Sequence, residues 1–259
     1  MRATSRQCRR TAIATRQFFE TLEEHFGGNL PIDQGRAAEV IVRDTLEASD
    51  LQRLFQHQAT AIHIPNYFPR ASAIELGSQL ARQVQEGKAK NWKVSTAQGL
   101  ESSDVFTLGA HVPYNVAVAG GETDQYHLNV QKELRQRRRD EASNTAKTLW
   151  PLDQLRLELD QAWPQGAGLS RDSKNPQNYK GGGLPRIMLG PTRWKKGFVH
   201  VDEMAPLSPE SGFFSGNIYL QLPDTTKTEI PQPVLEIWPL GIHNKWDWYK
   251  VRNSFHLMF

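Results

Sequence analysis

The residues best suited to chemistry lie in the segment Lys196-Gly-Phe-Val-His-Val-Asp-Glu-Met-Ala-Pro206, which places a histidine and an aspartate two positions apart. In a β-strand, residues two apart point to the same face, so His200 and Asp202 are expected to project together, with Val201 turned away. A neutral imidazole beside a carboxylate supplies two of the three protein ligands of the 2-His-1-carboxylate iron site. Because this tripeptide pattern is common, the flanking segments have to support the prediction.

The next segment, Ser215-Gly-Asn-Ile-Tyr-Leu-Gln-Leu222, alternates between apolar and polar residues. Its apolar face suits packing against helices, and its polar face suits the lining of a cavity inside a barrel. The apolar face comprises Ile218, Leu220 and Leu222, and the polar face comprises Asn217, Tyr219 and Gln221. An edge strand with a solvated polar face is the alternative interpretation.

Helical patterns dominate the first part of the chain, and short strand patterns dominate the last part. Helices are predicted over residues 17–26, 49–57, 71–85 and 151–163, strands over 60–68, 184–189, 197–202, 213–222 and 234–238, and a loop over 167–183. The short apolar stretch 38–42 fits either a strand or a helix start, and residues 87–126 show no clear pattern. Helices followed by a run of short strands indicate a helical layer packed on a β-sandwich or barrel.

In this order of elements, the chain resembles the iron- and 2-oxoglutarate-dependent dioxygenases. The segments that carry the resemblance are Leu30–Glu39, Leu152–Pro164, the His200–Asp202 strand, Asn217–Leu222 and Val234–Trp238. They are most similar to the small-molecule branch, which hydroxylates free or N-substituted amino acids and has halogenating relatives. The resemblance implies an α+β, mainly β fold: a double-stranded β-helix (jelly-roll, cupin-like) core over residues 184–259 and a helical or mixed N-terminal part over 1–165, as one oxygenase domain over 1–259.

The resemblance also implies roles for individual residues. His200 and Asp202 would bind Fe(II), and Asn217 and Tyr219 would lie near the carboxylates of the cosubstrate 2-oxoglutarate. The halogenating relatives have Gly or Ala in place of the aspartate, so Asp202 favours hydroxylation over halogenation.

The last part of the chain departs from the family pattern, which has a distal histidine followed by an arginine or lysine. His256, in an apolar strand-like setting, is predicted as the third iron ligand, whereas His243 looks like a turn residue. Since no arginine follows His256, Arg252 is the candidate partner of the 2-oxoglutarate carboxylate, with Arg193 as an alternative. The family's usual layout places the distal histidine beyond residue 259, so we expect the chain to lack the family's last strands.

Composition is that of a globular protein, with 38% hydrophobic and 23% charged residues and a net charge of +3. The chain has one cysteine, Cys8, which indicates a reducing, cytoplasmic compartment and leaves histidines and carboxylates as metal ligands. The first 19 residues hold five arginines and no acid, which fits a basic tail or an organelle transit peptide. No apolar run approaches the roughly 18–20 residues of a membrane helix.

The remaining charged residues and histidines bear on what the protein binds. The basic run 132–139 is predicted to be a solvated helix face rather than a nucleic-acid site, and His57, His63, His111 and His127 are predicted to be structural. Basic residues in 132–139 and 193–196 favour an anionic small-molecule substrate, used together with O2. A degenerate or truncated non-catalytic member of the fold and a cupin-type metal enzyme without 2-oxoglutarate remain alternatives.

Overall fold

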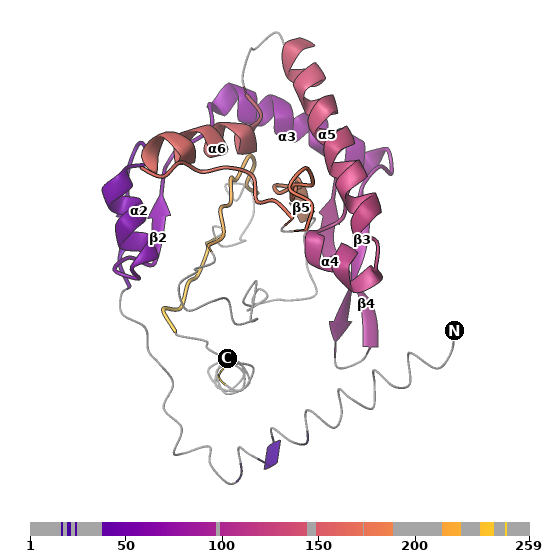
Figure 1. Cartoon of the computed structure of the whole chain (residues 1–259), viewed down its shortest axis with the longest axis horizontal. Coiled ribbons are helices and arrows are strands. Elements are labelled where there is room, and N and C mark those ends of the chain that lie inside the picture. Colours follow the sequence, from indigo (N-terminus) through magenta and orange to yellow (C-terminus); the bar gives the residue numbers. More distant parts are fainter. Residues whose placement is uncertain are drawn as a thin grey trace.

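The computed structural model describes residues 38–96, 99–143, 149–172, 174–188, 214–223 and 234–240, together with positions 17, 20, 21, 24 and 247. The four isolated positions between 17 and 24 are helical, within the predicted helix 17–26. Figure 1 shows α2 and β2 on one side of the molecule, β3, β4, α4 and α5 on the other, and α3 and α6 between them. None of the helices in the described ranges is long and apolar enough to cross a membrane.

The first unit consists of β1 (Val40–Val42), α2 (Ala48–Phe55) and β2 (Ala61–His63). The two strands pair in parallel, with Val40 opposite Ala61, and the helix makes the crossover that a parallel pair needs. Asp50 lies in the first turn of α2. Its carboxylate pairs with Arg43 at 2.8 Å, and this ion pair holds the helix to the end of β1. The strand predicted over residues 60–68 is limited to three residues, since Asn66 turns the chain with a φ of 56°.

Two longer helices follow the sequence prediction closely. Helix α3 spans Arg70–Gln85, and α6 spans Pro151–Ala162 with Pro151 in its first turn, where the missing N–H costs no hydrogen bond. Helix α6 ends where Trp163 adopts an extended conformation ahead of Pro164. The Trp163 ring packs edge-on against Phe55 of α2, with ring centroids 5.0 Å apart, and this contact joins α6 to the first unit.

A three-stranded antiparallel sheet comes mostly from the region without a clear sequence pattern. Strand β4 (Gly99–Thr107) pairs with β3 (Lys90–Thr96) on one edge and with β5 (Arg186–Met188) on the other. Strand β5 confirms the middle of the strand predicted over residues 184–189, while residues 184 and 185 carry no strand. The other two strands carry serines and charged residues and a register shift between Asn91 and Lys93, so a period-two hydrophobic pattern does not reveal them.

The hydrophobic core of this side of the molecule lies between α4 (Tyr114–Gly120) and α5 (Thr123–Ser143). Gly121, with a φ of 71°, ends α4 in the left-handed conformation that glycine adopts without strain. Ala117 of α4 packs with Tyr126, Val130 and Leu134, which recur every four residues along one face of α5. The remaining α5 surface is strongly polar, so the helix is amphipathic with a narrow apolar face.

The predicted jelly-roll core stays a prediction. Within the described ranges there are one two-stranded and one three-stranded sheet and no closed barrel. The strand predicted over 197–202 lies outside the described residues. The predicted strands 213–222 and 234–238 are not confirmed, since residues 214–223 and 234–240 carry no strand in the structure.

Candidate functional site

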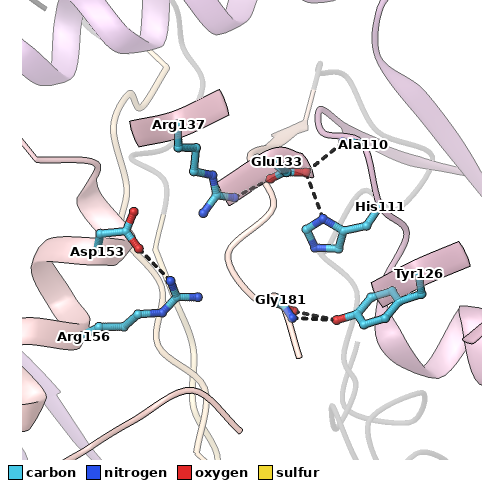
Figure 2. A network of polar contacts seen from close by, with 8 residues as sticks. All are labelled: Ala110, His111, Tyr126, Glu133, Arg137, Asp153, Arg156 and Gly181. Carbon is cyan, nitrogen blue, oxygen red and sulfur yellow. Dashed lines mark hydrogen bonds and ion pairs between the residues drawn. The ribbon is translucent and has the colours of Figure 1, made fainter. Parts of the chain in front are cut away.

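The most extensive network of buried polar side chains in the described ranges surrounds α5, and it is called the α5 polar cluster below. It comprises His111, Tyr126, His127, Glu133 and Arg137. All are buried except Glu133, whose side chain is 11% exposed. Figure 2 shows four of these residues, with His111 reaching Glu133 from the segment that follows β4.

Helical spacing explains how α5 builds this cluster. Glu133 and Arg137 are four residues apart and form an ion pair, Arg137 Nη2 to Glu133 Oε1, at 2.5 Å. Tyr126 lies seven residues before Glu133 and therefore faces a similar direction two turns earlier. The apolar side chains of Val130 and Leu134 lie among these polar groups and exclude water from them.

Glu133 is the centre of the cluster. One carboxylate oxygen accepts hydrogen bonds from the Ala110 backbone N–H at 2.8 Å and from His111 Nδ1 at 2.9 Å, and the other accepts from Arg137. Burial alone would raise the pKa of Glu133, but the hydrogen bond from His111 and the electrostatic attraction of His111 and Arg137 outweigh burial and lower the pKa to about 2. Glu133 is therefore ionised at neutral pH.

The loop over residues 167–183 docks on the same face of α5. The Tyr126 hydroxyl accepts a hydrogen bond from the Gly181 N–H and donates one to the Gly181 carbonyl, each at 2.9 Å. A Cβ at Gly181 would lie 2.8 Å from Val130 and 3.0 Å from His111, so only glycine allows this approach. The loop prediction is confirmed, with one isolated bridge between Arg171 and Tyr179.

His127 forms a second contact with the loop. Its Nδ1 donates to the Tyr179 carbonyl at 3.1 Å. Nε2 has no hydrogen-bond partner, although Asp172 lies 3.8 Å away, too far for a hydrogen bond. The predicted structural role is supported for His127 and also for His111, because each ring anchors one segment to another.

Most of the predicted site residues lie outside the described residues. These are His200, Asp202, His256 and Arg252, and the alternatives His243 and Arg193 lie outside them too. Asn217 and Tyr219 are described; both are exposed, and the Tyr219 side chain is 54% accessible. The structure thus places two of the six predicted residues, and it places them on the exposed side of one extended segment.

That segment, residues 214–223, follows the helical layer. The Phe214 ring lies 4.8 Å from the Phe55 ring of α2, and Leu155 of α6 lies 3.3 Å from the position of a Cβ on Gly216. Further along, Gln221 lies 3.2 Å from the position of a Cβ on Gly77 of α3. One ten-residue segment therefore contacts three helices.

The predicted two-faced pattern of this segment holds only in part. Ile218 and Leu220 are half-buried, while Asn217, Tyr219 and Gln221 are exposed. Leu222, expected on the apolar face, is 54% exposed. The alternation in burial therefore does not extend to Leu222.

The described part of the chain contains no group of three or more His, Cys, Asp or Glu side chains that would hold a metal ion. Glu133 is committed to Ala110, His111 and Arg137, and His127 has one distant carboxylate beside it. The iron site predicted at His200 and Asp202 lies outside the described residues and stays a prediction.

The structure also reveals charged residues that the sequence analysis missed. Arg137, predicted to be solvated with the rest of the basic run, is 6% exposed, so that prediction is wrong for this residue. The other arginines of the run, Arg135, Arg138 and Arg139, are exposed as predicted. The signal was present in the spacing, since Arg137 follows Glu133 by four residues and Leu134 by three on the face that Val130 identifies as buried.

Arg156 of α6 is the second such residue. Its Nη1 lies 2.6 Å from Asp153 Oδ1 on the same helix, and its side chain is 24% exposed. Arg156 falls between apolar residues of α6, so a hydrophobic pattern alone does not distinguish it from an ordinary surface arginine.

Comparisons with protein-family models, with curated proteins and with solved structures find no match to this chain. These comparisons therefore assign neither a family nor an activity to the chain.

Proposed function

We propose that this chain is an Fe(II)- and 2-oxoglutarate-dependent oxygenase that hydroxylates an unactivated C–H bond of a small molecule, an amino acid or a derivative of one. The observation that carries the proposal is the strand-type segment containing His200 and Asp202, followed by the alternating segment 215–222. The proposed fold is a double-stranded β-helix core with an N-terminal helical layer. Cys8, as the single cysteine, supports a cytoplasmic location for the enzyme.

His200, Asp202 and His256 would hold the iron, and Asn217, Tyr219 and Arg252 would contact the 2-oxoglutarate carboxylates. When bound, iron with 2-oxoglutarate and O2 supplies the oxidising power that amino-acid side chains lack. The ligand set suits this chemistry, because one carboxylate and two imidazoles leave coordination positions for cosubstrate and O2.

The arrangement of segment 214–223 is compatible with the proposal. Its apolar residues Ile218 and Leu220 are half-buried, whereas Asn217 and Tyr219 are exposed. An amide and a phenol there can donate hydrogen bonds to a carboxylate. Their contribution would be to orient the cosubstrate, not to bind metal.

The test is an anaerobic titration of the full chain with Fe(II) and 2-oxoglutarate, observed through the weak visible charge-transfer absorption of the chelate. We expect the band to appear in the wild type and to vanish in Asp202→Ala. Asp124→Ala, at an exposed position on α5, is the matched control and should keep the band. His256→Ala then tests the third ligand.

Other outcomes identify the alternatives. Iron binding without any response to 2-oxoglutarate would indicate a cupin-type metal enzyme. Failure of a well-folded chain to bind iron would contradict the proposal and leave a non-catalytic binding protein of the same fold.

A further inference from the structure

Two arginines from neighbouring helices point toward one another. Figure 2 shows the guanidinium group of Arg137, on α5, directed toward that of Arg156, on α6. A hydrogen bond joins the two helices: the Trp150 backbone N–H at the start of α6 donates to Glu141 of α5 at 2.7 Å. The two arginines are thus presented by elements that hold a fixed relation to one another.

Two contacts hold the Arg137 side chain, but one of its N–H groups has no acceptor among the described residues. Its Nη2 pairs with Glu133, and its Cζ lies 5.1 Å from the centroid of the Trp150 ring. The side chain is 7% exposed, and its Nη1 is buried with no hydrogen-bond partner among the described residues. A buried donor on a charged group is costly to leave unpaired, so this N–H is a position where an acceptor belongs.

Arg156 is close enough to Arg137 for the two charges to interact. Burial lowers the pKa of Arg156, the Asp153 carboxylate raises it, and the nearby Arg137 lowers it again. Asp153 lies one turn earlier on the same helix and pairs with Arg156 Nη1 at 2.6 Å. Arg137 already pairs with Glu133 and Arg156 with Asp153, so the donor that remains unused among the described residues is the buried Nη1 of Arg137.

We propose that Arg137 and Arg156 together bind the carboxylate group of a small organic molecule. A guanidinium group presents its N–H donors in a plane that matches the two oxygens of a carboxylate. A carboxylate oxygen at Arg137 Nη1 satisfies the buried donor. The site itself depends only on α5 and α6; the identification of its ligand as the substrate of the oxygenase rests on the proposed function.

Burial distinguishes this pair from the exposed basic surface of α5. Arg135, Arg138 and Arg139 face solvent, where a polyanion such as nucleic acid would reach them. A side chain that is only 7% exposed, as Arg137 is, does not reach a phosphate backbone outside the protein. The proposed ligand is therefore a small anion and not a polyanion.

The test measures anion binding to the full chain without iron or 2-oxoglutarate, so its result does not depend on the oxygenase proposal. Propionate is titrated by isothermal calorimetry at constant ionic strength, with inorganic phosphate and chloride as comparison anions. We expect saturable propionate binding that weakens about tenfold in Arg156→Gln, the loss typical of one charge-assisted hydrogen bond. Arg138→Gln removes the same charge from an exposed position of α5 and should bind as the wild type does.

Arg137→Gln is a less direct variant, because it also removes the partner of Glu133 and is expected to destabilise the fold. Arg156→Gln therefore carries the test, and the side-chain Nε–Hε NMR signal of Arg137 in the wild type should shift with propionate. Equal weakening in Arg156→Gln and Arg138→Gln, or an absence of saturable binding, would overturn the site. Binding of phosphate but not propionate would overturn the carboxylate assignment.

Discussion

The α5 polar cluster and segment 214–223 both carry polar side chains interleaved with apolar ones, but they are packed very differently. In the cluster, Tyr126 is 2% exposed and has both of its hydroxyl contacts on Gly181. In the segment, Tyr219 is 54% exposed. A tyrosine thus occurs in an amphipathic pattern in both regions. It is buried and hydrogen-bonded in the cluster, and it is exposed in the segment.

The difference comes from the number of elements that cover each region. The cluster is covered by α4, by the segment 108–111 and by the loop 167–183, so its polar groups need partners within the protein. Segment 214–223 contacts helices through Phe214, Gly216 and Gln221, and most of its side chains stay exposed. Buried polar groups around α5 should therefore contribute to stability, whereas polar groups of the segment should contribute to binding.

Glu133→Gln should show the largest difference between the two regions. It removes the charge that holds Arg137 and weakens the acceptor of His111 and Ala110, so we expect a loss of about 3–5 kcal/mol in the free energy of unfolding. Urea denaturation at neutral pH measures it. Glu75→Gln, at an exposed position of α3, is the matched control and should change stability by less than about 0.5 kcal/mol. A similar loss in both variants would show that Glu133 is not specially placed.

The contribution of Glu133 should also depend on pH. Its folded-state pKa of about 2 lies below the ordinary value near 4.3, so its stabilisation is present above about pH 5 and is lost as the pH falls toward 2. The full effect amounts to about 3 kcal/mol, since one pKa unit corresponds to about 1.4 kcal/mol. Denaturation curves of wild type and Glu133→Gln between pH 2 and pH 7 should converge at the acid end. A gap that stays constant with pH would contradict the lowered pKa.

A pair of valine substitutions tests packing without any change in charge. Val130→Ala removes two methyl groups from a side chain that is 1% exposed, and we expect a loss of about 2 kcal/mol. Val234→Ala makes the same change at a side chain that is 75% exposed, where the effect should stay within about 0.5 kcal/mol. Thermal denaturation of both variants gives the comparison. A large loss in Val234→Ala would mean that segment 234–240 is covered in solution.

A pair of tyrosine substitutions should give the smallest stability effect. Tyr126→Phe leaves the Gly181 N–H and carbonyl without their partner, and we expect a loss of about 1–2 kcal/mol. Tyr219→Phe should leave stability unchanged and, under the proposed function, weaken 2-oxoglutarate binding severalfold. Denaturation and the anaerobic titration provide the two measurements. If Tyr219→Phe destabilised the fold as much as Tyr126→Phe, the division between the two regions would be lost.

Helices α3 and α6 could be predicted from the sequence because each depends mainly on local signals. Pro151 marks the start of α6, and an apolar stripe of leucines identifies its covered face. The sheet β3-β4-β5 could not be predicted in the same way, since its central strand joins residues 99–107 to residues 186–188 across about 80 positions. Pairing between distant segments leaves little trace in either segment alone.

The chemically important residues show the same difference between local signals and contacts across the chain. The pairing of His200 with Asp202 needs only the period of a strand, so the sequence alone suggests it, and it lies outside the described residues. The environment of Arg137 needed the fold: its residue type and its basic neighbours indicate solvent, and only the packing of α5 against Trp150 and α6 shows that it is buried.

Local periodicity by itself determined where α3 and α6 begin and end and which residues of segment 215–222 alternate. Tertiary structure decided which of those faces became covered, which histidines became anchors, and which two arginines meet. The physical reason is that spacing along the chain sets the direction of a side chain, whereas its burial, its charge state and its partners depend on segments that are distant in sequence.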